Sequence, residues 1–208
     1  MAATLVHSPR YCSLAVRIAA AEGGVELGLI ENDPRTRVLE DGRSLLELNP
    51  LGTVSVLLLE SGVVIRETVA ALLWVQDHAT APVRREPGSA AYYRQLQWLC
   101  FLSTELHTKL FRVVFYPEAT DAVKDNFRAL TPARLELIEA ALGTQAYLVD
   151  DAWSVADAYL TWILTLLGRA EVSIESSPAL SEYQRRALQR PAVQRLLADD
   201  DRRIAARG

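Results

Sequence analysis

The chain is poor in cysteine and lacks any long hydrophobic run. Its two cysteines, Cys12 and Cys100, stand far apart among 208 residues, without a CxxC pair or a Cys/His spacing that suits zinc. A disulfide framework and a metal site are therefore not expected. No apolar stretch approaches the roughly 18 residues of a membrane helix, and the N-terminus has no signal-peptide core. We expect a cytoplasmic protein without membrane contact.

The chain also lacks an excess of basic over acidic residues. The formal net charge is −4, whereas a phosphate-binding surface normally leaves an excess of lysine and arginine. Nucleic acid is therefore not an expected partner. Hydrophobic residues make up 50% of the chain and charged residues 23%, which is ordinary for a globular protein and excludes a disordered one. At 208 residues the chain can form one or two small domains.

The N-terminal part contains a predicted β-hairpin followed by a helix. The run from Val54 to Leu59 is almost entirely apolar, the stretch Glu60-Ser61-Gly62 has turn chemistry, and Val63 to Ile65 is β-branched throughout. The dipeptide Glu67-Thr68 then offers side-chain acceptors for the first amides of a helix. The pattern predicts two antiparallel strands that lead directly into a helix start.

A strand-helix-strand unit is predicted before this hairpin. Ala3 to Val6 and Val25 to Ile30 have strand character, and the segment between them is helical from about Cys12 to the pair Gly23-Gly24. A parallel strand pair joined by a helical crossover, followed by a hairpin and a helix, forms a four-stranded mixed sheet. The fold class of this part is therefore α/β.

Every long segment after the hairpin domain has helical periodicity. We predict an N-terminal domain over residues 1–78, a linker over 79–88 that is rich in proline and charge, and an all-helical domain over 89–208. One long helix with an apolar stripe is expected from Tyr92 to Val114, because Pro117 follows. A later helix, apolar nearly all round, opens with the capping pattern Ser154-Val-Ala-Asp157 and belongs in the centre of a domain.

The order of these motifs resembles that of glutathione transferases, and in particular of the bacterial beta class. The resemblance implies a thioredoxin-like domain that binds glutathione, an all-helical domain, and an apolar pocket for an electrophile. It also implies a homodimer. The stretches that carry it are YCSLAVRIAAAEGG (11–24), the segment Asn49–Asp77, WLCFLSTELH (98–107) and SVADAYL (154–160).

Cys12 is the main chemical candidate. A thiol at a helix N-terminus feels unpaired amides and the helix dipole, which can lower its pKa to roughly 3.5–7.5. By position alone, a small buried hydrophobe is an equal alternative. The resemblance implies that Cys12 contacts glutathione, with Ser13 or Tyr11 as alternative donors of a hydroxyl to the glutathione sulfur. We expect Cys12 to react with thiol-directed probes faster than Cys100.

Four further residues are implied by the resemblance to hold glutathione. Val54 would pair its backbone with the cysteinyl part, Glu67 and Thr68 would hold the γ-glutamyl end, and Arg37 would approach the glycine carboxylate. The alternative roles are a helix cap for Glu67 and Thr68 and a solvated loop position for Arg37. Ser55 stands where the family has a cis-proline. Since a cis bond before another residue costs about 2.5–4 kcal/mol, we expect the Val54–Ser55 bond to be trans.

His107 lies on the apolar stripe of the long helix, where a lone histidine is more often a satisfied core residue. The resemblance implies instead that His107 faces the glutathione site as a hydrogen-bond donor or proton acceptor. Thr104, one turn earlier, is implied to contact the same ligand. The neighbouring asparagine and lysine of the family are replaced by Cys100 and Thr108.

The combined interpretation is a glutathione transferase with glutathione as co-substrate. It would activate the glutathione thiol for attack on an apolar electrophile, in conjugation, thiol exchange, or a glutathione-assisted isomerisation or elimination. The alternative, from another class, is a non-catalytic transferase-like module for binding or regulation. Ser55 and Cys100 favour this alternative. The enzyme is favoured by the retention of Cys12, Arg37, Glu67, Thr68 and His107.

Overall fold

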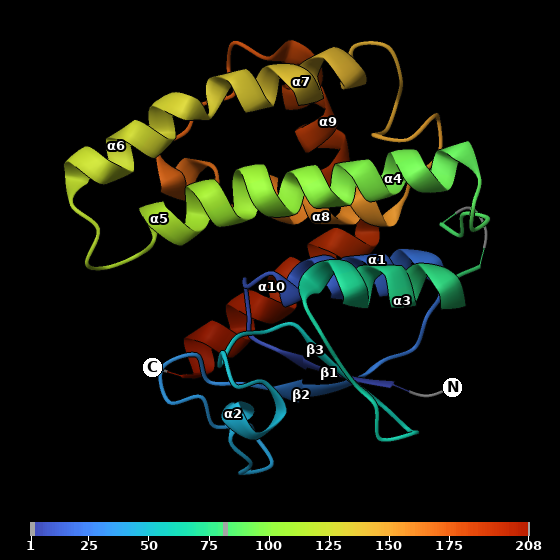
Figure 1. Ribbon diagram of the computed structural model, residues 1–208, viewed down its shortest axis with the longest axis vertical. Helices are drawn as coiled ribbons and strands as arrows, with labels where there is room; N and C mark the ends of the chain where they lie inside the picture. Colours follow the sequence, from blue (N-terminus) through green and yellow to red (C-terminus); the bar gives the residue numbers. More distant parts are fainter. Residues whose placement is uncertain (1–2, 81–82, 208) are drawn as a thin grey trace. The chain divides into compact units, whose positions relative to one another are not determined.

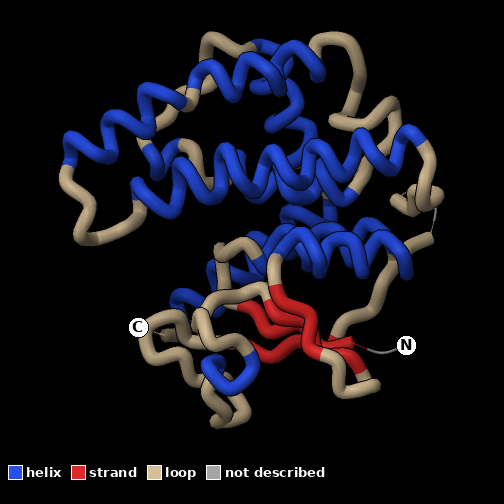
Figure 2. The backbone as a smooth tube through the Cα atoms, in the orientation of Figure 1, coloured by secondary structure: helices blue, strands red, loops and turns tan. Residues whose placement is uncertain are grey.

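The computed structural model describes residues 3–80 and 83–207 and divides into two compact units. The N-terminal unit comprises residues 1–84 together with 190–208, and the helical unit comprises residues 85–189. The strands all belong to the N-terminal unit (Figure 2). The predicted division at a linker over 79–88 stays a prediction, and residues 81–82 of that linker lie outside the described ranges.

The N-terminal unit is built on a four-stranded mixed sheet with the order β2-β1-β3-β4. The central strand β1 pairs in parallel with β2, and β3 pairs antiparallel with both β1 and β4. This topology confirms the predicted thioredoxin-like sheet. The strands are β1 (Ala3–His7), β2 (Gly28–Glu31), β3 (Val56–Leu59) and β4 (Val64–Arg66).

Helices α1 (Ser13–Gly23) and α3 (Thr68–His78) lie side by side next to this sheet (Figure 1). Their buried aliphatic side chains pack against each other and against the strands, and in α1 every residue from Ser13 to Ala20 is buried. Gly23 is required at the end of α1, since a Cβ atom there would lie 2.8 Å from the Cβ of Ala79. The short helix α2 (Leu45–Leu48) lies in the connection between β2 and β3.

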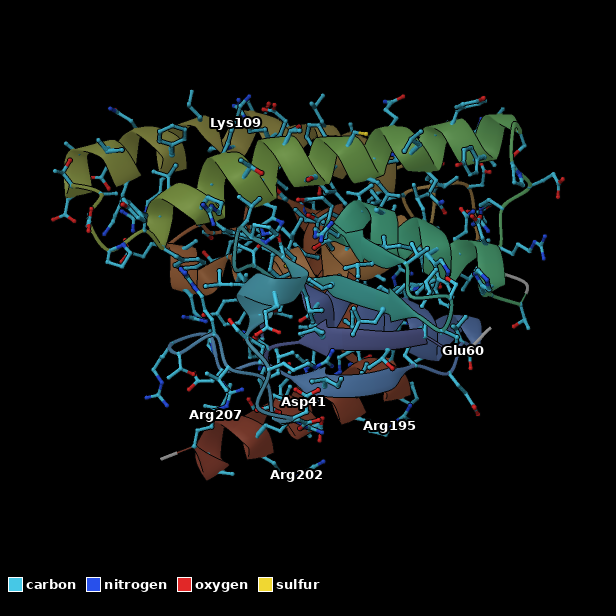
Figure 3. The ribbon with its side chains drawn as sticks, turned by 60° about the horizontal axis from the view of Figure 1, so that its bottom comes forward. Asp41, Glu60, Lys109, Arg195, Arg202 and Arg207 are labelled. Carbon is cyan, nitrogen blue, oxygen red and sulfur yellow. The ribbon has the colours of Figure 1, made fainter. Side chains whose placement is uncertain are left out.

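Helix α10 (Pro191–Ala206) belongs to the N-terminal unit and is joined to it by buried charges. The Arg17 guanidinium on α1 donates to Asp199 at 2.7 Å and also pairs with Asp200, whose side chain is fully buried. Arg203 pairs with Glu31 at the end of β2 at 2.7 Å. Losing one partner would leave a buried charge uncompensated, so these pairs fix where α10 lies on the unit. The side chains of Arg195 and Arg202 on this helix project from the unit in Figure 3.

In the helical unit, the predicted long helix is continuous but changes its geometry. Helix α4 (Ala90–Phe101) runs without a break into a π-helical segment, η1 (Leu102–Phe111), and ends in α5 (Arg112–Val114) (Figure 1). The sequence predicted one long helix without this π-helical segment. The segment is defined by backbone hydrogen bonds from residue i+5 to residue i, and the spacing of apolar side chains does not indicate them. The remaining elements are α6 (Asp121–Leu130), α7 (Pro132–Leu142), α8 (Val155–Leu164), the 3₁₀ turn η2 (Gly168–Ala170) and α9 (Pro178–Leu188).

The predicted cap of the central helix α8 is built around the buried carboxylate of Asp157. This carboxylate accepts hydrogen bonds from the Ser154 amide at 2.9 Å, the Ser154 hydroxyl at 2.6 Å and the Leu148 amide at 3.0 Å. The hydroxyl of Tyr183 on α9 donates a fourth at 3.0 Å. Burial raises the pKa of Asp157, and these donors oppose the rise. The cap therefore connects α8 to both the preceding loop and α9.

Removing the Asp157 carboxylate should destabilise the helical unit. We expect Ser154→Ala to cost about 1 kcal/mol of unfolding free energy, as for loss of an N-cap. Asp157→Ala should cost about 3 kcal/mol, because the buried donors of Leu148 and Tyr183 lose their acceptor. Urea unfolding measures both, with Ser61→Ala in the exposed hairpin turn as the control. An unchanged midpoint in both cap variants would contradict this assignment.

Candidate active site

Four connections of the N-terminal unit meet at one end of the sheet. Because β2 runs parallel to β1, the ends of both strands lie together, with His7 opposite Glu31. Because β3 runs antiparallel to β1, its first residue, Val56, lies beside Val6 near the end of β1. The last residue of β4, Arg66, pairs with the same Val56. The segments that carry Cys12, Arg37, Val54 and Thr68 therefore start from a common edge.

The structure brings Cys12, Val54 and Thr68 together at this edge. The Cys12 thiol donates a hydrogen bond to the Val54 carbonyl at 3.1 Å. The hydroxyls of Ser55 and Thr68 lie 3.3 Å apart and are both buried. Both hydroxyls lie close enough to the Cys12 thiol to lower its pKa. Three of the predicted glutathione-binding residues thus form one contact cluster, with Ser55 as a fourth member.

The Val54–Ser55 peptide bond is cis, so the expected trans bond is wrong. The expectation weighed only the intrinsic preference of the bond. It left out the surroundings of Ser55, whose side chain is 2% exposed and lies against the Thr68 hydroxyl at the start of α3.

The expected low pKa of Cys12 is also wrong. Burial is the largest influence and raises the pKa of this thiol, and the charge of Glu67 raises it further. Hydrogen bonds with Thr68 and Ser55 lower the pKa but do not reverse the shift. Cys12 is at the N-cap position of α1, as predicted, yet its thiol turns to the Val54 carbonyl and is only 6% exposed. Desolvation of the thiolate outweighs the helix dipole here.

Glu67 and Arg37 lie exposed beside this cluster. Glu67 is the N-cap residue of α3 with a φ of 75°, but its side chain makes no capping hydrogen bond, so the predicted side-chain cap is wrong at this position. Its carboxylate is near enough to act on the Cys12 thiol. The Arg37 side chain runs along Gly52, where an added Cβ would meet its Cδ at 2.9 Å. It therefore follows the loop that leads to Val54. Both charges are available to a ligand, and their roles stay predictions.

The two alternative hydroxyls differ in availability. Ser13 is fully buried, and its hydroxyl accepts from the Ser8 amide at 3.1 Å and donates to the Ser8 carbonyl at 3.2 Å. These two bonds close the turn before α1, so the Ser13 hydroxyl is already used. Tyr11 is 49% exposed. Of these two hydroxyls, only that of Tyr11 remains accessible.

His107 and Thr104 belong to the helical unit. His107 Nδ1 is 2.7 Å from the Tyr159 hydroxyl, and its ring lies edge-on to Trp162 with centroids 4.7 Å apart. Burial, and then the charge of Arg112, lower the pKa of His107 to about 4. The imidazole is therefore neutral near pH 7. Thr104 is exposed, and its hydroxyl donates to the Cys100 carbonyl at 3.0 Å.

The pairing of His107 with Cys12 stays a prediction, because the two residues belong to different units. Sequence reasoning missed Tyr159, which is fully buried on α8 and contacts His107. Helical periodicity marked α8 as apolar nearly all round, and nothing in the motif Ser154-Val-Ala-Asp157 indicates this contact. Within residues 3–80 and 83–207, no group of three or more His, Cys, Asp or Glu side chains could hold a metal ion. None of the helices in these ranges has the length and apolarity that crossing a bilayer requires.

A thioredoxin-like sheet that carries a thiol and two hydroxyls at one edge, combined with a helical unit, defines a class of thiol-handling proteins. Comparison with known proteins identifies the family. Residues 95–191 match the family model "Glutathione S-transferase, C-terminal domain". The chain is 30% identical to the glutathione S-transferase GstA of Escherichia coli O157:H7 over 199 residues, which covers 93% of this chain and 96% of that protein.

Solved structures agree with this match. The sphingomonad glutathione S-transferase complexed with glutathione is 33% identical, with a TM-score of 0.89, and the match covers 97% of this chain and 99% of the other. The bacterial beta class enzyme of Sphingomonas chungbukensis is 31% identical, with a TM-score of 0.88 and coverages of 96% and 98%. The chain belongs to the glutathione S-transferase family, and its predicted fold and enzyme class, a glutathione transferase, are confirmed. The predicted co-substrate is the ligand of the sphingomonad structure.

The two cysteines should differ in reactivity, in the opposite order to the expectation from the sequence. Cys100 is exposed, whereas Cys12 is buried and its pKa is raised. Since the thiolate is the reacting form, a thiol-directed probe at pH 7.5 should label Cys100 first. Labelling rates of the single-cysteine variants Cys12→Ala and Cys100→Ser, followed by mass spectrometry, measure this order. Faster labelling of the variant that retains Cys12 would refute it.

His107 should weaken the protein in acid. The pKa of His107 is about 4 in the folded chain, whereas an unfolded histidine has a pKa of about 6.5. Between these values only the unfolded chain binds the proton, so stability is lost as pH falls below 6.5. At pH 5 this loss is about 2 kcal/mol.

The variant His107→Asn removes this contribution. The fall in unfolding free energy between pH 7.5 and pH 5 should be about 2 kcal/mol smaller in the variant than in the wild type. Urea titrations at the two pH values measure the difference. Gln194→Asn, at an exposed position of α10 that carries no titratable group, is the control and should keep the wild-type difference. An equal fall in wild type and His107→Asn would rule out the buried neutral imidazole.

Proposed function

We propose that glutathione binds along the edge of the sheet in the N-terminal unit, with its sulfur next to Cys12. The observation that supports this most directly is the cluster of the Cys12 thiol, the Val54 carbonyl and the Thr68 hydroxyl. A backbone carbonyl beside hydrogen-bond donors suits the amide and thiol of a cysteinyl peptide. Glutathione is such a peptide, and its sulfur would replace the Val54 carbonyl as the acceptor from Cys12.

The raised pKa of Cys12 favours one kind of chemistry. A thiol that stays protonated near pH 7 can donate a hydrogen bond to the glutathione thiolate and so stabilise it. A Cys12 thiolate would instead repel that charge. The glutathione sulfur is then the nucleophile, and Cys12 and Thr68 are the donors that hold it in the reactive form. This arrangement supports conjugation over thiol exchange through Cys12.

Each end of glutathione would lie next to a side chain of opposite charge. Glu67, exposed at the start of α3, would pair with the amino group of the γ-glutamyl end. Arg37, exposed along the loop to Val54, would pair with the glycine carboxylate, for which a guanidinium offers two parallel donors. A zwitterionic tripeptide is held by both charges together.

The electrophile is proposed to meet the aromatic side chains around His107. His107, Trp162 and Phe111 form a connected row, with the rings of Phe111 and Trp162 5.9 Å apart. A neutral imidazole with a low pKa is a weak base, so we assign His107 the role of a hydrogen-bond partner. Thr104, exposed one turn earlier, would contact the same ligand. The electrophile would be small and largely apolar.

Binding to glutathione tests this assignment. Glu67→Gln should weaken glutathione binding roughly tenfold, because it removes the charge partner of the ligand's amino group. Titration calorimetry with glutathione, followed by a conjugation assay with a chlorodinitrobenzene, measures both steps. Glu60→Gln, in the exposed turn between β3 and β4 (Figure 3), is the matched control and should bind as the wild type does. Equal affinities for the two variants would argue against the role of Glu67.

The alternative function is a transferase-like module that binds glutathione without catalysis. The same two measurements separate it from the enzyme, since a binding module would retain the titration and lack conjugation. The buried Ser55 hydroxyl, which replaces a ring carbon of proline, is the feature that favours this alternative.

We further propose that the protein is a homodimer that acts in the cytoplasm. The chain has a mass of 23.0 kDa, and light scattering after size exclusion should give about twice this value. A single species at the monomer mass would exclude the dimer. The proposal of a cytoplasmic location is supported by the two free cysteines, because neither forms a disulfide that would need an oxidising compartment.

A further inference from the structure

Two arginines flank the exposed end of the aromatic row in the helical unit. The row continues from His107 and Trp162 through Phe111 to Phe115, whose ring stacks on that of Phe111 with centroids 5.6 Å apart. Phe111 and Trp162 are buried, whereas Phe115 is 37% exposed. The row therefore leads from the neutral imidazole of His107 to the surface of the unit. Arg112 on α5 precedes Phe115 by three residues, so the two side chains are neighbours on the helix surface, and Arg169 lies over the Phe115 ring.

The π-helical segment places Arg112 on the side of His107. The Arg112 amide donates to the His107 carbonyl, which is the i to i+5 bond of a π-helix. In an α-helix, a residue five positions later points about 140° away, because each residue advances about 100°. The π-helical hydrogen bond instead places Arg112 one helical turn after His107, so that the two residues lie on the same side of the helix. The charge of Arg112 acts on His107 and lowers the pKa of the imidazole, in agreement with this geometry.

Arg169 reaches the exposed end of the row, at Phe115, from a separate element. Its guanidinium carbon lies over the Phe115 ring, 5.3 Å from the centroid. The turn η2 that carries it is held by Arg128, which donates to the Ala170 carbonyl at 3.0 Å and pairs with Glu171 at 2.9 Å. Arg169 is thus presented over the end of the row by a fixed turn.

Neither guanidinium is neutralised. Over the residues that the structure describes, the side chains of Arg112 and Arg169 make no hydrogen bond or ion pair, and both are exposed. The nearby carboxylates are used elsewhere, since Glu171 pairs with Arg128 and Glu118 accepts from the Tyr116 hydroxyl at 3.0 Å. Two unpaired cations beside an aromatic surface attract an anion that carries an aromatic body.

We propose that Arg112 and Arg169 form an anion subsite, and that the electrophile is an aromatic compound bearing a carboxylate. This inference rests on the proposed function, in which the row around His107 takes the electrophile. The ring would lie along the row near Phe115, and the carboxylate would be paired by the two guanidinium groups. Arg112 and Arg169 are therefore residues that determine specificity.

A pair of electrophiles that differ only in charge tests the subsite. One is a chlorodinitrobenzoate, and the other is the chlorodinitrobenzene that lacks its carboxylate. In both reactions the glutathione sulfur bonds to the ring carbon that carries chlorine, chloride leaves with the bonding electron pair, and the thiol proton passes to the buffer. The kcat/KM values for both substrates are measured at pH 7.5 and low salt.

The variants are Arg112→Gln and Arg169→Gln, with Arg195→Gln on α10 as the control. Arg195 is exposed on another element (Figure 3), so its loss should change neither substrate. We expect each site variant to lose roughly tenfold in kcat/KM for the benzoate and less than twofold for the neutral substrate. Arg169→Lys, which keeps the charge, should recover part of the loss. At saturating glutathione, salt should lower the kcat/KM of the benzoate more than that of the neutral substrate.

The outcomes distinguish a failure of the anion subsite from a failure of the proposed function. If the wild type conjugates the neutral substrate but the site variants change both substrates equally, or neither, the anion subsite is wrong and the proposed function stands. If the wild type conjugates neither substrate and does not bind glutathione, the proposed function and the subsite both fail. A selective loss for the benzoate in both site variants, absent in Arg195→Gln, supports the subsite.

Discussion

The pairing of β3 with both β1 and β4 is the constraint on which the candidate site depends. It places the start of β3, the end of β1 and the end of β4 at one edge of the sheet. The helices α1 and α3 begin at this edge. Strand order alone therefore places Cys12 and Thr68 beside Val54. A register slip of one residue would turn the buried side chains of β3 to the other face and separate these groups. The site is thus a consequence of strand order.

Burial and the helix dipole act in opposite directions on the thiol at this edge. The dipole favours a thiolate by an amount that falls off within one turn, whereas burial penalises any uncompensated charge. For Cys12 the balance favours the protonated form, because the thiol is enclosed and already has an acceptor in the Val54 carbonyl. A protonated donor is the more useful partner for a second sulfur that must carry the negative charge. In the proposed complex, Cys12 is therefore the hydrogen-bond donor and the glutathione sulfur is the nucleophile.

The sequence was sufficient where one periodicity determines one element. The β-branched hairpin, the helix that begins at Thr68 and the cap at Ser154 and Asp157 are found as predicted, because each depends on neighbours within a few residues. The state of Cys12 and the Val54–Ser55 bond were not predictable in this way. Both depend on the surroundings of Ser55 and Thr68, which come together only after the sheet has formed.

The helical unit gives the clearest case of information that side-chain patterns do not contain. The apolar stripe from Tyr92 to Val114 fits an α-helix, and the π segment changes which residues share a face without changing the composition of the stripe. His107 could be proposed from its motif, but its neighbours could not. The Tyr159 hydroxyl contacts His107 from α8. Arg112 lies next to His107 because its amide makes a π-helical hydrogen bond to the His107 carbonyl. The local helix geometry thus places the charge of Arg112 next to the imidazole, and with Arg169 this charge forms the proposed anion subsite.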